Sequence, residues 1–501
     1  MLHRYYDSWP VPAARVSALL VTVLLFSGCQ WAATGADRAP DIREITVLYT
    51  NDEHGWMEGM EPALGAAGLY RLWQEREDYR PDGPFLILSG GDNWTGPAIS
   101  TWVEGESMVE VMNAMHYDAS AVGNHEFDFG LEALQQRLQE ADFPYLSANT
   151  LWRETGQVAA ELGILPYTLK EVNGLRIGII GLTTTSTPRT TNPQNVIRLQ
   201  FGDYEQALRA TVPQVRQAEP DLLFVIAHVC MAALEPLAIQ VEDLGIHLMG
   251  GGHCNELTAR RVNSTVLLGG GYHFTAYARA RISFDVTAGR VVDVQSGISS
   301  NEPLGEDPQI DSIVSRWQDQ FRGTLEEVVA WSSQDIDFRN GAFRQAVIDS
   351  WLRWDPSADI AITNAGGLRT SLPAGAITFN DLVNFMPFEN NIFAVEIPGR
   401  VVRQALESGG RPIVAGLVRR GDGWILTASG EPLQDDTFYR VLLNSFMYDG
   451  GDNFQMIRAA DPEGFDTGIH YRQPFVERLV ELQTSPQNPL VIGDLMDSVV
   501  P

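Results

Sequence analysis

Little cysteine and little positive charge are the first features of this 501-residue chain. Its three cysteines are too few for a disulfide framework of the kind that holds small secreted domains together. Lysine and arginine number 35 against 64 aspartates and glutamates, which gives a net charge of −29. This balance argues against nucleic acid as a partner, because phosphate backbones need basic patches. The net negative charge also repels an anionic substrate, which would need metal ions or arginines at its binding site to overcome that repulsion.

The apolar run of residues 16–28 is too short to be a comfortable membrane span. It follows two arginines and has the proportions of a signal peptide. It leads to Cys29 in a Ser-Gly-Cys sequence that resembles a bacterial lipoprotein processing site, and the following Gln30 resembles outer-membrane sorting. We therefore expect residues 1–29 to be a lipoprotein signal and residues 30–44 a polar tether. The alternative is a conventional cleaved signal or a membrane anchor.

One polar loop of the first half lies at residues 121–130. It places Asn124, His125 and Asp128 within five residues. A short apolar run precedes it and a helical pattern follows over residues 131–140, so it is predicted to leave the end of a strand. In open α/β sheets, ligands bind in the crevice outside the carboxyl ends of the strands.

Four other predicted strands, at residues 45–50, 85–89, 221–227 and 246–249, end in the same way. The polar residues that follow them are, in chain order, Asp52 and His54, Asp92, His228, and His253 and Asn255. Each alone is as well explained by a turn, a cap or a core histidine. Their repetition at five strand ends indicates one shared site instead. Nitrogen and oxygen donors without a cysteine cluster suit Zn, Mn, Co or Fe, and ligand type does not choose among them.

These ordered motifs resemble the calcineurin-like metallophosphoesterases. They are closer to the 5′-nucleotidase family, which includes UDP-sugar hydrolases. The motifs are Asn-Asp-x-His-Gly, Gly-Gly-Asp, Gly-Asn-His-Glu-Phe-Asp and Gly-Gly-His-x-Asn. The resemblance implies an α/β fold with an N-terminal four-layer α/β/β/α metallophosphoesterase sandwich at residues 45–302. A linker helix at residues 303–330 and a smaller α+β substrate-binding domain at residues 331–501 would follow it.

The resemblance also implies two divalent metal ions, with Zn, Mn or Co expected. One ion would be held by Asp52, His54 and Asn255, the other by Asn124, His228 and His253, with Asp92 shared between them. Two ions that share a carboxylate can activate water for in-line attack on phosphorus. His125 would then donate to a phosphate oxygen or to the leaving group, with Asp128 orienting its ring. Glu126 has no chemistry assigned and is expected to be structural or to face solvent.

In the second half, a predicted strand ends in Asn-Ala-Gly-Gly-Leu-Arg, which contains Gly367 and Arg369. Glycines followed by an arginine suit phosphate binding, and the alternative is a turn with a surface arginine. Residues 445–454 resemble the family's substrate loop. There Phe446 would stack on a nucleobase and Asp452 would bind the ribose hydroxyls.

Arg411 stands where the family's second base-stacking aromatic is expected. An arginine can stack on a base, or it can bind a phosphate or a sugar acid instead. Arg403 and Arg411 are both candidates for the family's second phosphate arginine. Cys230 and Cys254 each lie beside a proposed ligand. Small apolar fillers are the expectation for them, with a redox-sensitive thiol pair as the alternative.

We therefore expect a phosphoesterase that converts nucleotides or similar phosphate esters to nucleoside and phosphate outside the cytoplasm. The expected location is the periplasmic side of the cell envelope, with membrane contact only through a lipid anchor at Cys29. One alternative is a UDP-sugar or cyclic-nucleotide phosphodiesterase or a pyrophosphatase. Another is a surface-tethered binding protein without turnover.

Overall fold

The computed structural model describes residues 40–59, 64–408, 410 and 412–496. From Asp41 on, the chain forms one compact unit. The predicted signal peptide, Cys29, most of the tether and Arg411 lie outside the described residues. Within the described ranges, no helix combines the length and the hydropathy that a membrane span requires.

The first half of the described chain contains two mixed sheets of six strands each. The first sheet has, in spatial order, β14 (Arg290–Ser300), β13 (Ala276–Asp285), β1 (Ile42–Thr50), β2 (Phe85–Ser89), β3 (Ala119–Ala121) and β4 (Tyr145–Leu146). The second has β11 (Leu257–Val262), β12 (Thr265–Gly270), β10 (Leu248–Gly251), β9 (Leu222–His228), β7 (Leu175–Thr183) and β6 (Tyr167–Val172). In both, the central strands are parallel and at least one edge strand is antiparallel.

Strand β1 shows how the sequence builds the layers. Ile45, Val47 and Tyr49 are fully buried in the core between the two sheets, because alternate side chains of a strand point to one face. Leu48 points the other way, into a core shared with helices. The same alternation divides β7 between the inter-sheet core and the core on the outer face of the second sheet.

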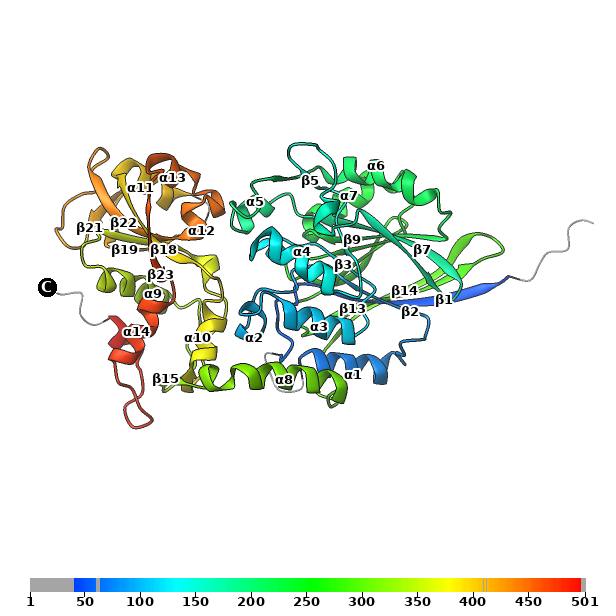
Figure 1. Ribbon diagram of the computed structural model, residues 1–501, viewed down its shortest axis with the longest axis horizontal. Helices are drawn as coiled ribbons and strands as arrows, with labels where there is room; N and C mark the ends of the chain where they lie inside the picture. Colours follow the sequence, from blue (N-terminus) through cyan, green and yellow to red (C-terminus); the bar gives the residue numbers. More distant parts are fainter. Residues whose placement is uncertain (1–39, 60–63, 409, 411, 497–501) are drawn as a thin grey trace, which may run out of the picture. The chain divides into compact units, whose positions relative to one another are not determined.

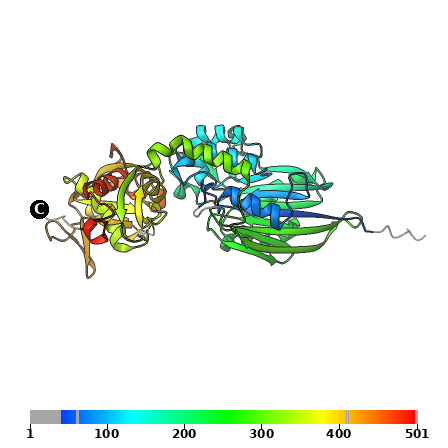
Figure 2. The ribbon, with the colours of Figure 1, turned by 90° about the horizontal axis from the view of Figure 1, so that it is seen from below.

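Helices cover both outer faces of the paired sheets. In Figure 1, α6 (Tyr204–Arg216) and α7 (Met231–Gln240) lie on one side of the sheets. On the other side lie α1 (Ala66–Arg76), α3 (Glu106–Ala114) and α8 (Pro308–Leu325). Figure 2 shows α8 running beside α1, which it contacts. The predicted four-layer α/β/β/α arrangement is therefore confirmed.

The rest of the described chain builds a smaller sheet with its own core. Its strands are, in spatial order, β19 (Pro412–Ala415), β16 (Ile360–Asn364), β22 (Phe438–Asn444), β18 (Asn391–Pro398) and β23 (Phe465–His470). The helices that pack with it include α9 (Gly341–Trp354), α11 (Gly399–Glu407), α13 (Gln455–Ala460) and α14 (Gln473–Glu481). Parallel strands β16 and β22 lead into the Gly367–Arg369 segment and the Phe446 loop.

Helix α8 is shorter than the sequence pattern predicts. It begins at Pro308, inside the predicted range of 303–330, with the Asp307 side chain accepting the first backbone N–H groups, and it ends at Leu325. Val328 and Val329, which the predicted helix included, belong instead to β15 (Val328–Ser332), which pairs with β17 (Gly375–Thr378). Their branched side chains favour a strand over a helix.

Trp351 is the side chain on which we would test the smaller core. It is fully buried, and its indole N–H donates to the Tyr471 carbonyl at 3.1 Å. Trp351→Ala is expected to lower the free energy of unfolding by about 3–5 kcal/mol, because it removes a large apolar group and leaves a cavity. Urea denaturation would measure it. Phe438→Ala, at a side chain 62% exposed, is the control, and an equal loss in both variants would contradict the assignment.

Candidate active site

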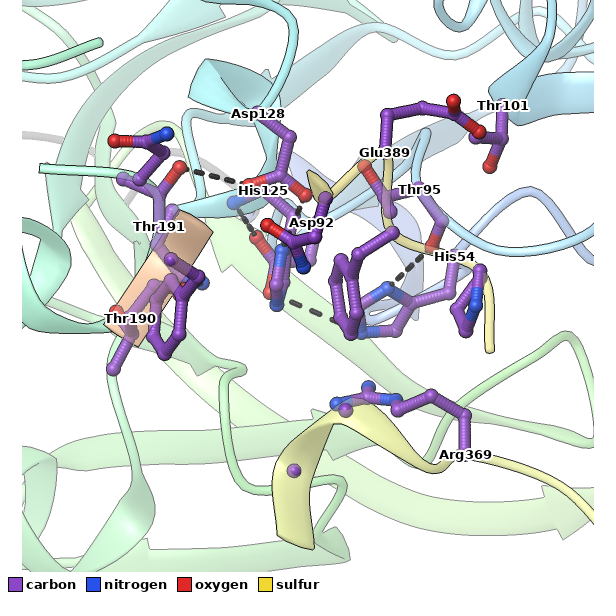
Figure 3. A pocket seen from close by; sticks show the side chains of 18 of the residues that line it. His54, Asp92, Thr95, Thr101, His125, Asp128, Thr190, Thr191, Arg369 and Glu389 are labelled. Carbon is purple, nitrogen blue, oxygen red and sulfur yellow. Dashed lines mark hydrogen bonds and ion pairs between the residues drawn. The ribbon is translucent and has the colours of Figure 1, made fainter. Parts of the chain in front are cut away.

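A cavity of about 300 Å³ opens at the carboxyl ends of the parallel strands. From the first half of the chain it is lined by Asp52, His54, Asp92, Asn124, His125, Asp128, His253 and Asn255, among others. From the second half it is lined by Gly367, Arg369, Phe446 and Asp452, among others. His228 lies behind this lining, 2.9 Å from Asp92. Figure 3 shows His54, Asp92, His125 and Arg369 around the same space. Arg411 lies outside the described residues.

Backbone strain is concentrated at this edge. Asp52, His54, Asp92, His253 and Asn255 all adopt a left-handed conformation, with φ between +48° and +72°. This conformation is rare for residues other than glycine and costs of the order of 1–3 kcal/mol each. It turns each chain sharply as it leaves its strand, so that the polar side chains point toward one another. Such strain persists only where surrounding contacts hold it.

The buried Glu126 carboxylate is one of those contacts. It accepts backbone N–H groups from Asp92, Asn93 and Gly123 at 2.9, 2.6 and 2.5 Å. These bonds join the loop after β2 to the loop after β3. Burial, with a smaller effect from Asp92, raises the pKa of Glu126 to about 8 despite those donors. Of the two expectations for Glu126, the structural one is confirmed and the solvent-facing one is wrong.

The orientation of two imidazoles is set by backbone carbonyls. His54 Nδ1 lies 2.9 Å from the Thr95 carbonyl oxygen, and His228 Nδ1 lies 2.8 Å from that of Gly90. A carbonyl only accepts, so each Nδ1 carries the proton. Each Nε2 is then directed to the carboxylates, at 3.9 Å from Asp92 Oδ2 for His54 and 2.9 Å for His228. A ring held by its other nitrogen in this way is typical of a metal-ligating histidine.

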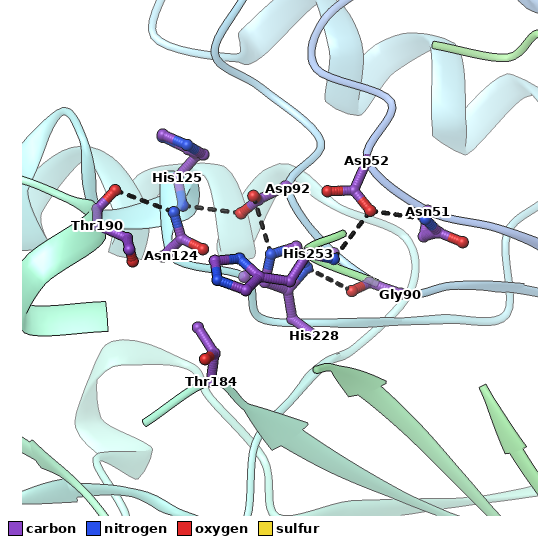
Figure 4. Close-up of polar contacts among 12 residues, drawn as sticks. Asn51, Asp52, Gly90, Asp92, Asn124, His125, Thr184, Thr190, His228 and His253 are labelled. Atoms are coloured by element: carbon purple, nitrogen blue, oxygen red, sulfur yellow. Dashed lines mark hydrogen bonds and ion pairs between the residues drawn. The ribbon is translucent and has the colours of Figure 1, made fainter. Parts of the chain in front are cut away.

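Two buried atoms at the centre that could bind a metal ion lack hydrogen-bond partners. Asn124 donates its amide to the Thr190 carbonyl at 3.1 Å, which leaves its buried Oδ1 without a partner (Figure 4). His228 Nε2 also makes no hydrogen bond, because its contact with Asp92 has only the distance and not the geometry of one. Buried acceptors need a hydrogen-bond donor or a cation as a partner. This donor set fits divalent cations.

Two overlapping groups of side chains could hold such cations. One is His54, Asp92 and His125, and the other is Asp92, His228 and His253, each with its ligand atoms within 4.8 Å of one another. Asp92 belongs to both, as a bridging carboxylate must. In the first group Asp52 also approaches His54 Nε2, at 3.8 Å. His253 is tied to this centre by its backbone N–H, which donates to Asp52 at 3.0 Å.

The site demands positive charge. When only protons balance the negative charge of the carboxylates, the pKa of His228 rises to about 10. Burial alone would lower it, but the attraction of Asp92 outweighs that effect. The pKa of Asp92 falls well below its ordinary value, because His228, His125 and His54 outweigh burial, which would raise it. Burial raises the pKa of Asp52 to about 6.

His125 and Asp128 form a hydrogen-bonded pair. His125 Nδ1 lies 2.7 Å from Asp128 Oδ2, and the other Asp128 oxygen accepts the Thr191 hydroxyl at 2.8 Å. The Asn195 amide donates to the Asp128 carbonyl at 2.8 Å and further holds the turn. Burial would lower the pKa of His125, but Asp128 and Asp92 outweigh it and raise the pKa. The ring is thus oriented and tends to carry a proton.

Thr191, Asn195 and Phe388 are parts of the site that the sequence analysis missed. Thr191 and Asn195 follow α5 (Thr187–Thr190), which comes soon after β7, so the strand-end pattern used elsewhere could have found them. Phe388 stacks on the His125 ring at 5.6 Å between centroids and lies 5.7 Å from the Arg369 guanidinium carbon. No spacing in the sequence relates Phe388 to His125.

The substrate-side residues fall into two groups. Asp452 accepts the Asn364 amide at 2.9 Å and lines the cavity with Phe446. Arg369 also lines it and forms no salt bridge with a carboxylate of the described residues. Arg403, by contrast, pairs with Asp435 at 2.8 Å and does not line the cavity. Its candidacy as a phosphate arginine is therefore not supported.

The two cysteines are joined in a disulfide. Cys230 and Cys254 are bonded, with their Cα atoms 5.1 Å apart. The expectation of two apolar fillers is wrong, and the alternative of a redox-sensitive thiol pair comes closer. Their separation of 24 residues gave no sign of pairing, because the two loops meet only when β9 and β10 align in the sheet.

Comparisons with known proteins agree with this architecture. A family model described as the 5′-nucleotidase C-terminal domain matches residues 323–459. The chain is 28% identical over 523 residues to a 5′-nucleotidase of Homo sapiens, covering 89% of this chain and 88% of the relative. It is 27% identical over 508 residues to one from Vibrio cholerae, covering 88% and 91%. A solved 5′-nucleotidase precursor from Thermus thermophilus shares the fold, with TM-score 0.77, 23% identity and coverage of 88% and 97%.

Removing the Glu126 carboxylate tests its role as a clamp. Glu126→Ala leaves three buried backbone donors without an acceptor, at about 1–3 kcal/mol each, so we expect the free energy of unfolding to fall by at least about 3 kcal/mol. Glu132→Ala, at an exposed acid a few residues on, should change it by less than about 0.5 kcal/mol. Urea denaturation of both variants decides, and a loss below 1 kcal/mol in Glu126→Ala would exclude the clamp.

Proposed function

The chain belongs to the 5′-nucleotidase family, and we propose that it is a dimetal phosphoesterase that hydrolyses 5′-nucleotides or nucleotide-like phosphate esters to nucleoside and phosphate outside the cytoplasm. One observation carries the proposal. Strand-end side chains from both sheets converge on Asp92, beside the hydrogen-bonded pair of His125 and Asp128. This arrangement offers a cation site and a proton donor at one point of the cavity.

The metal ligands divide into two sets around the shared Asp92. Asp52, His54 and Asn255 would hold one cation, and Asn124, His228 and His253 would hold the other. When bound, two such ions stabilise charge on phosphate oxygens and lower the pKa of a bound water. The unpartnered Asn124 Oδ1 and His228 Nε2 support this assignment. The neutral Asn124 adds no negative charge to the site, so a phosphate dianion is repelled less.

His125 acts on the phosphate or on the leaving group. Its Nδ1 is engaged by Asp128 at 2.7 Å, so its Nε2 is the nitrogen free to donate to a substrate oxygen. The raised pKa keeps the ring protonated over more of the neutral range. Stacking of Phe388 on the ring shields one face from water and restricts its rotation. The ester oxygen that leaves as the nucleoside hydroxyl would take the proton from Nε2.

Residues from the second half would bind the rest of the substrate. Arg369 offers a guanidinium to the phosphate, and Gly367 lets the backbone approach it. Phe446 offers a ring to a base and Asp452 a carboxylate to the ribose hydroxyls. We assign catalysis to residues 45–302 and substrate binding to residues 331–501, with residues 303–330 as the linker. Separate hydrophobic cores in the two parts support this division.

The proposed location is the periplasmic side of the cell envelope, with a lipid anchor at Cys29. The lipoprotein-like sequence before Cys29 supports the anchor. The Cys230–Cys254 disulfide supports the compartment, because disulfides persist in oxidising environments and are rare in the reducing cytosol.

Substitution of His125 tests the chemistry. His125→Ala is expected to lower kcat for AMP and p-nitrophenyl phosphate by about 10²–10⁴-fold, the usual contribution of a positioned acid. Asp92→Asn should remove activity and metal binding together, since it weakens both cation sites. Circular dichroism would verify the fold of each variant.

The matched control for these variants is His116→Asn. His116 is exposed and has a left-handed backbone that asparagine tolerates, so its replacement should leave kcat unchanged. Full activity in both His125→Ala and Asp92→Asn would refute the proposed function.

Asp452 tests specificity for a nucleoside. Asp452→Asn keeps the size of the side chain and suits the left-handed backbone at φ +50°. It should raise KM for AMP about 10-fold, because a charge-assisted hydrogen bond to the ribose is lost. p-Nitrophenyl phosphate has no ribose, so its kinetics should not change. A parallel change for both substrates would mean that Asp452 acts on the phosphate or on the fold.

A further inference from the structure

The Cys230–Cys254 disulfide joins two loops that carry proposed metal ligands. Cys230 lies two residues after His228, and Cys254 lies between His253 and Asn255. His228 is fully buried at the end of β9, whereas Cys254 and Asn255 are exposed. The bond therefore links the rigid end of a central strand to the exposed turn that presents two further ligands.

The strained backbone of residues 253–255 needs contacts with other parts of the chain to keep its conformation. His253 and Asn255 have φ values of +72° and +57°, so both neighbours of Cys254 are in the strained left-handed region. Two polar contacts already join the loops. The Gly252 N–H donates to the Val229 carbonyl at 3.2 Å, and the Met231 N–H donates to Glu256 at 2.7 Å. Both lie outside the strained turn, on either side of it. Within the turn, the His253 N–H donates to Asp52 at 3.0 Å, and the disulfide holds Cys254, the residue between the two strained ones.

We propose that this disulfide is a positioning element of the metal site: it holds His253 and Asn255 at the distance from His228 that binding of both cations requires. The inference rests on the proposed function, because it presumes that these residues are ligands. A covalent bond between Cys230 and Cys254 limits the turn to conformations that keep His253 and Asn255, on either side of Cys254, in the lining of the cavity. Without it, the turn relaxes to less strained backbone angles and the ligands separate.

Exposure of Cys254 makes the bond accessible to reductants. A phosphine reductant such as tris(2-carboxyethyl)phosphine would break the S–S bond and be oxidised to the phosphine oxide, which takes its oxygen from water. Cys230 and Cys254 each gain one electron and one proton and become thiols. Metal affinity is thereby coupled to the redox state of the surroundings.

The test measures metal binding directly. Mn²⁺ or Zn²⁺ is titrated calorimetrically into the chelator-stripped protein in four forms: wild type, wild type reduced after folding, and the Cys230→Ser/Cys254→Ser variant with and without reductant. In the reduced protein and in the variant, we expect the Kd of the more weakly held ion to rise about 10- to 100-fold, the usual effect of losing a group that orients a ligand. Reductant should have no further effect on the variant.

Two other readouts separate the possible failures. Activity at saturating metal should largely return in the variant, because its catalytic residues are intact. If reduction lowers the unfolding temperature of the metal-free protein but leaves both Kd values unchanged, the disulfide is only a structural cross-link and the inference is wrong. Reduction of the folded wild type provides this result even if the serine variant does not fold. Absence of metal binding by the oxidised wild type would overturn the proposed function itself.

Discussion

The hydrogen bonds of one buried carboxylate hold the site together. Glu126 accepts backbone N–H groups from the loops after β2 and β3, so Asp92 and Asn124 keep a fixed separation. Asp92 in turn accepts the backbone N–H of His125 at 2.8 Å and lies 2.9 Å from His228. Backbone contacts of the loops thus place Asp92 and Asn124, and contacts of their side chains with backbone groups orient His54 and His228. That is why strained φ values persist at five of these positions.

The charge of the chain and the charge that the site attracts have opposite signs. The whole chain carries a net charge of −29, yet its proposed substrate is an anion. The cavity resolves this conflict locally, because imidazole and carboxylate donors create a strong demand for cations and Arg369 adds a fixed positive charge. With the two proposed cations bound, the local field would attract phosphate although the net charge of the chain repels it at a distance. The same demand explains why His228 would otherwise hold a proton so tightly.

Most of the proposed metal site could be predicted from the sequence because strand ends are visible in it. Apolar runs that end in Asp52, Asp92 or His253 mark the carboxyl ends of parallel strands, and these ends must share an edge. Thr191 and Asn195 follow the same logic, but they belong to a loop at residues 184–198 that contains hydroxyls and amides and no acid or histidine. The sequence shows Glu126 in this loop but does not reveal its role. An acid in a polar loop shows its burial only when neighbouring loops close over it.

The sequence by itself determined the strands, their polar ends and the resemblance to the 5′-nucleotidase family, which in turn implied the sandwich fold. Hydrophobic alternation and local motifs encode these features over a few residues at a time. Only the tertiary structure decided which nitrogen of His54 and His228 faces the centre, because the carbonyl that accepts from the other nitrogen comes from a distant loop. It alone brought Phe388 onto His125 and joined Cys230 to Cys254. Such pairings depend on how sheets and loops align in space, which no local pattern records.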